Sequence, residues 1–125
     1  MTTALEVIRA TPYYTHIGLF PGPDGAVVLP ASDAFAGDEG SSFVHGGVIA
    51  AFLEAAMVIL LRSTQSPSAR CTDFTTTFLR TTQVAEITAR ARILHTGRRF
   101  AQAEVKAWQT DASAPVAIGQ GTLLL

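Results

Sequence analysis

The sequence predicts an α+β fold in which a curved antiparallel sheet wraps around one long central helix. The helix is predicted by a run from Val48 to Leu61 in which Glu54 is the single polar residue. The sheet is predicted by later segments that alternate apolar and polar residues, which is the periodicity of a half-buried strand. A helix that is apolar on all sides must be covered, and a sheet with one apolar face covers it economically.

The composition is that of a single domain, and we expect residues 1–125 to form it. A chain of 125 residues is long enough to bury a substantial core. The formal net charge of −1 argues against a nucleic-acid-binding protein, which carries a clustered basic excess. Cys71 is the only cysteine, which excludes an intrachain disulfide and a cysteine-based metal cluster. We expect no metal, no cofactor and a reduced, cytoplasmic setting.

The apolar run is too short to cross a membrane. As a helix it would extend about 21 Å, against roughly 30 Å for the hydrocarbon core of a bilayer. The segment 1–10 also lacks the basic start and apolar run of a signal peptide. We therefore expect a core helix and no membrane partner. Because 48% of so small a chain is hydrophobic, part of its surface is expected to be buried in an oligomer.

The segments before the long helix are short. Pro12 is placed to begin a helical turn and Gly18 to end it. We expect a helix over 3–10, a helical turn over 13–17 and a tight turn over 21–25. A strand over 26–30 and a loop or irregular strand over 31–44 should follow. The long helix itself is expected over 47–62.

The segments after the long helix have β composition. We expect strands over 73–80, 84–94, 99–109 and 116–125, joined as an antiparallel meander. The second and third of these alternate cleanly, and the segment between them has the composition of a hairpin connection. The last is apolar enough to lie in the centre of the sheet.

The residues that carry chemistry stand at the start and in the middle of the long helix. His45 is followed by Gly46 and Gly47, which leave backbone N–H groups bare where a helix has unpaired donors and a partial positive charge. A polarised oxygen would bind well there. Glu54 lies within the apolar run, where an ionised carboxylate is costly to bury. Either Glu54 faces water, or it belongs to a site that uses its altered acidity.

Helical geometry separates these two features. Glu54 is eight residues beyond Gly46, or about 12 Å further along the axis. One small carbonyl group cannot contact both in the same chain. If both serve one reaction, they come from two chains whose helices run antiparallel, which predicts a dimer with two equivalent sites. The small residues Gly47, Ala51 and Ala55 would form a stripe that permits such close approach.

The pattern resembles the hotdog fold, and within it the small acyl-CoA thioesterases of the phenylacetate-degradation and 4-hydroxybenzoyl-CoA type. The resemblance covers about residues 12–124. It is carried by His45-Gly46-Gly47 after Val44, by the acid Glu54 nine residues beyond the histidine, by Phe78-Leu79-Arg80, and by Gly97-Arg98-Arg99 before an alternating strand.

This resemblance implies hydrolysis of an acyl-CoA thioester with an aryl or medium-chain acyl group. The Gly46 N–H of one subunit would polarise the thioester carbonyl, and Glu54 of the other would act as general base or as nucleophile. His45 would orient the loop or the thioester, unless it is a structural cap. The family also implies an obligate homodimer, often paired into a homotetramer, with no cofactor.

Further residues are expected to bind substrate, beginning with Gly47 at the helix start. Glu39 stands six residues before His45, where family members often carry Asn or Gln, and the alternative is a solvated loop residue. Cys71 or Thr72 falls where the family often has a Ser or Thr that faces the acid. The side chains of Arg98 and Arg99 are suited to the phosphates of coenzyme A, and the alternative is a solubilising strand face.

Two other functions compete with hydrolysis. A hydratase or dehydratase of acyl thioesters would resemble a different motif, with a proline-rich turn after the histidine. A non-catalytic acyl-CoA-binding protein is the second alternative, and Glu39 is the feature that favours it. The sequence does not distinguish coenzyme A from an acyl carrier protein as the carrier.

Overall fold

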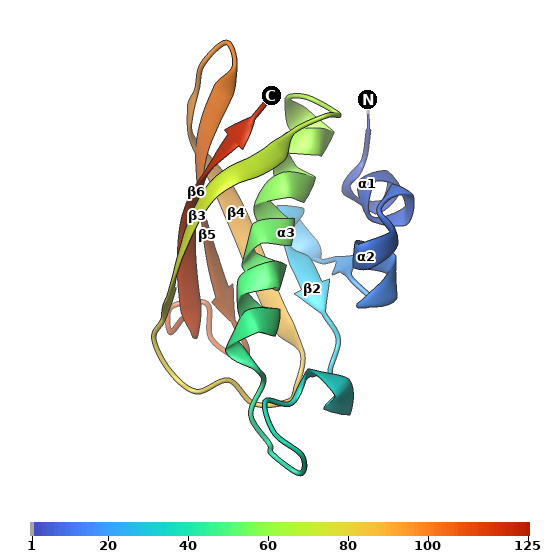
Figure 1. Ribbon diagram of the computed structural model, residues 1–125, viewed down its shortest axis with the longest axis vertical. Coiled ribbons are helices and arrows are strands. Elements are labelled where there is room, and N and C mark those ends of the chain that lie inside the picture. The colour runs from blue at the N-terminus through green and yellow to red at the C-terminus, as the bar shows by residue number, and fades with distance from the viewer. Residues whose placement is uncertain (1) are drawn as a thin grey trace.

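The computed structural model describes residues 2–125, which form one sheet, one long helix and two short helices (Figure 1). The helices are α1 (Ala4–Ala10), α2 (Pro12–His16) and α3 (Gly46–Thr64), with 3₁₀ turns η1 (Pro23–Gly25) and η2 (Asp33–Phe35). The strands are β1 (Phe20–Pro21), β2 (Val27–Leu29), β3 (Arg70–Phe78), β4 (Ile87–Thr96), β5 (Phe100–Trp108) and β6 (Ala117–Leu124). The predicted α+β architecture is confirmed.

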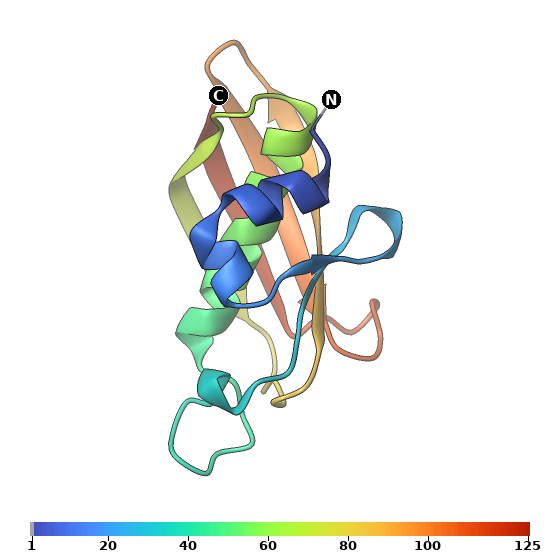
Figure 2. The same cartoon turned by 90° about the vertical axis from the view of Figure 1, so that its right-hand side faces the viewer.

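The molecule has three layers, with α3 between the sheet and the pair α1 and α2 (Figures 1 and 2). The helix is 19 residues long, which exceeds the apolar run read from the sequence, so by length and composition alone it would qualify as a membrane span, contrary to the expectation that it is too short. However, it lies between the other layers, and nine of its side chains are buried, among them Phe52, Leu53 and Met57. The helix is therefore the core helix that the sequence predicts.

The sheet is antiparallel in the order β1-β2-β4-β5-β6-β3. The expected alternation is present, since Ala101, Ala103, Val105 and Ala107 of β5 are all buried. The last strand, β6, lies inside the sheet as predicted.

The expected meander of four strands is wrong in one respect. Only β4, β5 and β6 form a meander, whereas β3 pairs with β6 at the edge and the segment 79–86 crosses to β4. The composition of the strands explains this order. Six of the nine residues of β3 are Thr, Asp or Arg, which are tolerated at an edge, and the more apolar β5 and β6 occupy the interior.

The edge strand β3 lies beside α3 and has an irregularity near its start. Its register against β6 shifts between Cys71 and Asp73, so Thr72 is the extra residue of a β-bulge. Beyond the bulge, Phe74 approaches β6 at Gly119, where a Cβ would lie 2.8 Å from the ring. Phe78, at the end of the strand, reaches the start of α3. The strand thus connects the two parts of α3 that carry the candidate site residues.

Candidate active site

The start of α3 is capped by a side chain from its own loop. His45 is the N-cap residue, with extended backbone, and its Nδ1 accepts a hydrogen bond from the Gly47 N–H at 2.8 Å. Because Nδ1 is the acceptor, the proton of the neutral imidazole is on Nε2. His45 therefore caps the helix, and its expected role at the thioester stays a prediction. The Gly47 N–H is consequently engaged, and the expected contact of Gly47 with substrate stays a prediction.

The backbone N–H of Gly46 is left free. The N–H groups of Val48 and Ile49 both donate to the His45 carbonyl, whereas no acceptor for the Gly46 N–H lies within residues 2–125. The ring of Phe78 covers Gly46 so closely that an added Cβ would lie 3.3 Å from its Cζ. A hollow of about 360 Å³ opens here, lined in part by Phe43, Ile49 and Phe78. The free donor thus faces a partly apolar hollow at the positive end of a helix.

The loop before α3 is fixed by backbone hydrogen bonds. The Val44 N–H donates to the Thr82 carbonyl at 2.8 Å, and the His45 N–H donates to the Phe35 carbonyl at 2.8 Å. An isolated bridge also joins Phe43 to Gln83. The expected loop or irregular strand is therefore an ordered connection, and it holds the Gly46 donor in a defined place.

Glu54 lies in the middle of α3 and is half-buried. Within the described part of the chain its carboxylate has neither a hydrogen bond nor an ion pair. Burial raises the pKa of Glu54 above its usual value, and the positive charge of Arg62 acts in the opposite direction. Its negative charge in turn contributes to the raised pKa values of Tyr14 and Cys71. The carboxylate is therefore close enough to Tyr14 and Cys71 to act on both groups electrostatically.

An open strip of small residues connects the two features. Gly47 is exposed, and Ala50, Ala51 and Glu54 are partly exposed. The sequence predicted a stripe of Gly47, Ala51 and Ala55. This prediction is wrong at its third position, because Ala55 is fully buried. An α-helix has 3.6 residues per turn, so residues four apart are offset by more than a full turn. After two such steps from Gly47, Ala55 has rotated away from the stripe and into the core. The corrected strip leads from the free donor to the free carboxylate.

Cys71 and Thr72 differ in their surroundings. The Cys71 thiol donates to the Asp73 carbonyl at 3.3 Å, and a Cβ at Gly121 would lie 3.5 Å from its sulfur. Burial raises the pKa of the thiol, assisted by the charge of Glu54, so Cys71 is a poor thiolate nucleophile. Thr72 lies in the bulge, is exposed, and its hydroxyl donates to the Thr122 carbonyl at 3.3 Å. Of the two, Cys71 is the residue near Glu54.

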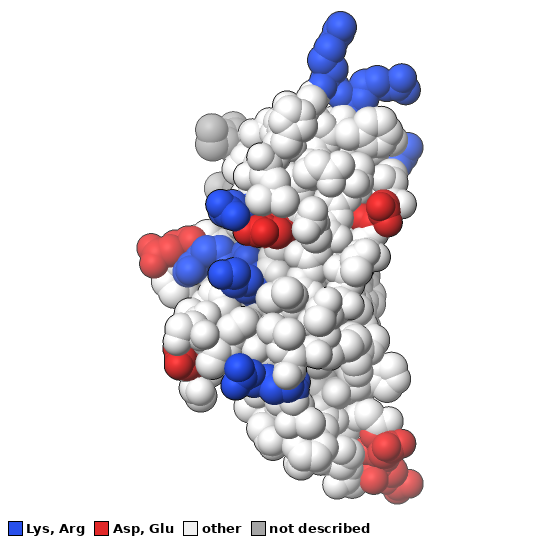
Figure 3. Space-filling model, turned by 90° about the vertical axis from the view of Figure 1, so that its left-hand side faces the viewer, with Lys and Arg blue, Asp and Glu red and all other residues white. Residues whose placement is uncertain are grey.

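The remaining predicted site residues lie at opposite ends of the folded molecule. Glu39 is exposed in the loop 36–44, which projects beyond the start of α3. Arg98 and Arg99 are exposed in the β4–β5 hairpin at the other end (Figures 1 and 2). Figure 3 shows basic side chains projecting at the hairpin end and acidic ones at the loop end. One chain does not bring these residues together with Glu54.

The family comparison adds an independent observation. The family model of the thioesterase superfamily matches residues 42–115, which include His45, Gly46, Glu54 and the strands β3 to β5. The match covers more than half of the chain. The chain belongs to the thioesterase superfamily. It is a thioester hydrolase with the hotdog fold, as the sequence resemblance implied.

Solved structures share the fold of this thioesterase over nearly the whole chain. A conserved protein from Pseudomonas aeruginosa, PA5202, is 28% identical with a TM-score of 0.79, covering 91% of this chain and 93% of its own. BH2602 from Bacillus halodurans, solved with CoA, is 21% identical with a TM-score of 0.76, covering 98% and 85%. PaaI from the phenylacetic acid degradation operon of E. coli is 19% identical with a TM-score of 0.79, covering 97% and 91%. No curated protein sequence matches the chain.

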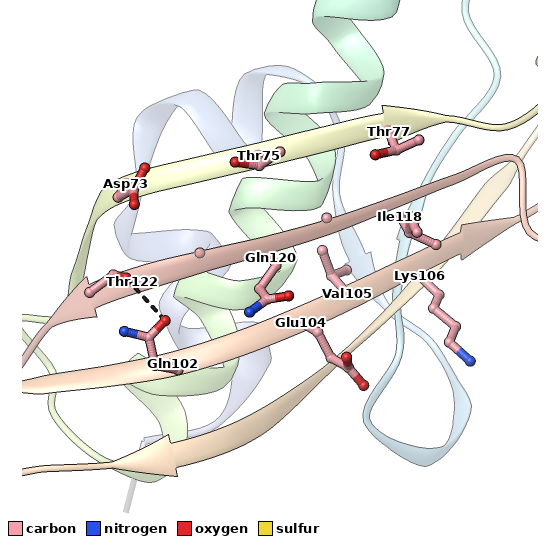
Figure 4. A pocket seen from close by; sticks show the side chains of 12 residues that line it. Asp73, Thr75, Thr77, Gln102, Glu104, Val105, Lys106, Ile118, Gln120 and Thr122 are labelled. Atoms are coloured by element: carbon pink, nitrogen blue, oxygen red, sulfur yellow. Dashed lines mark hydrogen bonds between the residues drawn. The ribbon is translucent and has the colours of Figure 1, made fainter.

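The thioesterase has another hollow, of about 430 Å³, on the face of the sheet that is turned away from α3 (Figure 4). Its lining comes from β3, β5 and β6 and includes Thr75, Thr77, Gln120 and Thr122. The sheet separates this hollow from Glu54. It is therefore not part of the candidate active site.

Sequence reasoning missed the role of Phe78 in this thioesterase. Its motif was noted, but its position over Gly46 depends on the pairing of β3 with β6, which brings the end of β3 to the start of α3. One signal was available, because a large aromatic residue ends a strand that is otherwise rich in threonine.

Proposed function

We propose that this thioesterase hydrolyses acyl-CoA thioesters to the free acid and coenzyme A, at two equivalent sites of a homodimer. Each site takes Glu54 from one subunit and the Gly46 N–H from the other. The observation that carries the proposal is the pair of unpartnered groups on α3, joined by an open strip of small residues. An unpartnered donor and an unpartnered half-buried carboxylate each call for a ligand or a partner.

The dimer follows from the distance between these groups. They are separated by about 12 Å along one helix, so a single carbonyl reaches both only if two helices lie antiparallel. Gly47, Ala50 and Ala51 have little or no side chain, which permits two such helices to approach closely. In that arrangement, the Gly46 N–H of each subunit is placed beside the Glu54 of the other. The two-fold axis produces two identical sites.

The chemistry proceeds from these two groups. The thioester oxygen accepts a hydrogen bond from the Gly46 N–H, which stabilises the negative charge of the tetrahedral intermediate. As general base, Glu54 takes a proton from water while the water oxygen attacks the carbonyl carbon. The carbon–sulfur bond then breaks, and the departing thiolate receives the proton. The raised pKa of Glu54 strengthens it as a base.

A nucleophilic Glu54 is the second route. Its carboxylate oxygen would attack the carbonyl carbon and expel the thiolate, and water would then hydrolyse the resulting anhydride. Mass spectrometry after a single turnover in ¹⁸O-labelled water tests for the anhydride. If water attacks the glutamyl carbon of the anhydride, ¹⁸O enters the Glu54 carboxylate and the acid leaves with an unlabelled oxygen from Glu54. The general-base route places ¹⁸O in the acid and never in Glu54, so a labelled Glu54 demonstrates the nucleophilic route.

The substrate is proposed to extend from the helix start to the basic end of the partner. The apolar hollow beside Phe43, Ile49 and Phe78 is suited to an aryl or medium-chain acyl group. Arg98 and Arg99 are proposed to bind the phosphates of coenzyme A as bidentate donors. Bound CoA in BH2602 from Bacillus halodurans supports this choice of carrier. Cys71 is proposed to line the site near the acid, and we place the enzyme in the cytoplasm, where this single thiol stays reduced.

Two dimers are proposed to pair into a homotetramer through the outer face of the sheet. Its half over β3 and β6 carries uncharged side chains, including Thr75, Thr77, Ile118 and Gln120, and Figure 3 shows few charges there. Sedimentation tests this contact, since Thr75→Lys with Gln120→Lys should yield dimers. A tetramer that persists in the double variant would place the contact elsewhere.

Release of thiol from a panel of acyl-CoA compounds tests the proposed function. Turnover that is lost in Glu54→Gln supports hydrolysis, whereas tight binding of acyl-CoA without turnover by the native protein supports the binding-protein alternative. Glu39, exposed and acidic where relatives often have an amide, is the feature that favours this alternative. Glu39→Gln should then restore turnover.

A further inference from the structure

Thr82 is a buried threonine whose hydroxyl group has no hydrogen-bond partner. Among the serine, threonine, glutamine and charged residues of the described range 2–125, it alone is buried, with an exposed fraction of 2%. Its Oγ1 atom is closed off from solvent and forms no hydrogen bond within that range. A buried hydroxyl without a partner costs free energy, so it calls for a functional or structural reason.

The residue belongs to the wall of the hollow at the start of α3. Thr82 lines this hollow of about 360 Å³ together with Gly46, whose N–H is the free donor of the candidate site. The rest of the wall is apolar apart from two exposed residues, Arg80 and Thr81. The Arg80 Nε is already engaged, since it donates to the Pro115 carbonyl at 3.1 Å. In a mainly apolar pocket, the few polar groups of the wall are the ones that orient and select a ligand.

The backbone of Thr82 is fixed beside the loop that leads into α3, whereas its hydroxyl is free to turn. The Val44 N–H donates to the Thr82 carbonyl at 2.8 Å, and the Val84 N–H donates to the Ser42 carbonyl at 2.8 Å. These two bonds hold the segment on both sides of Thr82. Rotation about χ1 to another staggered position breaks no hydrogen bond of the hydroxyl, because it makes none.

We propose that Thr82 is a specificity-determining residue, whose hydroxyl turns about χ1 and binds an oxygen substituent of the acyl group. This inference rests on the proposed function, in which the hollow holds the acyl group beside the Gly46 N–H. A hydroxyl or keto oxygen on the acyl group supplies the missing partner, whereas a plain hydrocarbon leaves the Thr82 hydroxyl unpaired. The proposal narrows the substrate class from aryl or medium-chain acyl groups to their oxygen-substituted forms.

The test compares matched acyl-CoA compounds that differ by one hydroxyl group. Phenylacetyl-CoA is paired with its ring-hydroxylated isomers and octanoyl-CoA with its hydroxyoctanoyl counterparts, and the kcat/KM of each hydroxylated compound is divided by that of its plain partner. This ratio should be about fivefold lower in Thr82→Val than in the native protein for the preferred pair, because valine keeps the shape and lacks the hydroxyl. Thr76→Val is the matched control. The Thr76 hydroxyl is likewise buried without a partner within residues 2–125, but Thr76 does not line this hollow, so the ratio should stay native.

Hydrolysis with the same ratio in Thr82→Val and the native protein for every pair would overturn the inference and leave the proposed function intact. If no compound is hydrolysed, the ratios are measured as dissociation constants by isothermal titration calorimetry. Affinity ratios that fall in Thr82→Val then support the inference although the proposed function has failed, and unchanged ratios or no binding of any compound overturn it.

A second pair of variants applies if Thr82→Val does not fold. Thr82→Ser keeps the hydroxyl and should keep the native ratio, whereas Thr82→Ala should lose it. Equal ratios in these two variants would likewise overturn the inference.

Discussion

On α3, the N–H of Gly46 and the carboxylate of Glu54, neither of which has a partner within residues 2–125, are separated by about 12 Å along the helix axis. The same open strip of small side chains reaches both. In the proposed reaction each group is half of a site, because a thioester carbonyl is far smaller than their separation. The separation thus makes a second subunit necessary for the proposed reaction.

Replacement of Glu54 should abolish most of the catalysis. Glu54→Gln keeps the shape of the side chain but removes the base, so kcat should fall by about 10²- to 10⁴-fold. Thiol release under saturating acyl-CoA measures this effect. Glu86→Gln is the matched control, since Glu86 is an exposed carboxylate outside α3 and its loss should leave kcat unchanged. Equal rates for Glu54→Gln and the native protein would refute the assignment of the base.

The raised pKa of Glu54 has a consequence for stability as well as for rate. In the folded protein Glu54 holds its proton at a higher pH than its ordinary value of 4.5. The folded state therefore binds more protons than the unfolded state between these two values, and stability falls as pH rises through this window. Glu54→Gln should accordingly have a higher Tm than the native protein at neutral pH. This difference should disappear below the ordinary pKa.

The pH dependence of catalysis has the same origin. In the proposed mechanism the ionised carboxylate is the base, so kcat/KM should decline on the acid side at a pH above the ordinary value of 4.5. A pH–rate profile and thermal unfolding at matched pH values check both expectations. An acid limb at or below the ordinary value, or a Tm difference that grows toward low pH, would contradict them.

The His45 cap should contribute mainly to stability. His45→Ala leaves the Gly47 N–H without its acceptor, which should lower the free energy of unfolding by about 1 kcal/mol. Urea unfolding measures the loss. His45→Asn supplies another capping side chain and should recover most of it. If His45→Ala lost activity while keeping full stability, His45 would have a direct role at the thioester.

The hairpin arginines should affect binding of the nucleotide part of the substrate. Arg98→Gln with Arg99→Gln should raise KM for acyl-CoA several-fold and leave kcat nearly unchanged. The matching acyl-pantetheine lacks the nucleotide phosphates, so its kinetics should not respond to the double variant. Arg9→Gln, a change of an exposed arginine on α1, serves as the control. Equal effects on both substrates would remove these arginines from the phosphate site.

The parts of the fold that follow from local periodicity could be predicted from the sequence. The apolar run fixed α3, and alternation placed the buried alanines of β5. The pairing of β3 with β6 could not be predicted in the same way, because it depends on contacts between segments far apart in the chain. The error in strand order followed from assuming that consecutive strands are neighbours.

The candidate site likewise has features that could be predicted from local sequence and features that could not. Gly46 and Glu54 stand out in the sequence because a bare helix start and a charge in an apolar run are local features. The engagement of the Gly47 N–H by His45 and the ring of Phe78 over Gly46 depend on side-chain directions and tertiary packing. No local pattern encodes them.

The most direct test of the two-subunit site mixes two inactive variants. Glu54→Gln removes the base, and Gly46→Pro removes the N–H donor at the first helical position, where proline is tolerated and the extended backbone of His45 is compatible with it. Gly46→Ala, which keeps the N–H, controls for crowding against Phe78. Equal co-expression with random pairing should restore roughly a quarter of the native activity, because one site of each mixed dimer is intact. Mixed dimers that form but remain as inactive as either parent would contradict a site shared between two subunits.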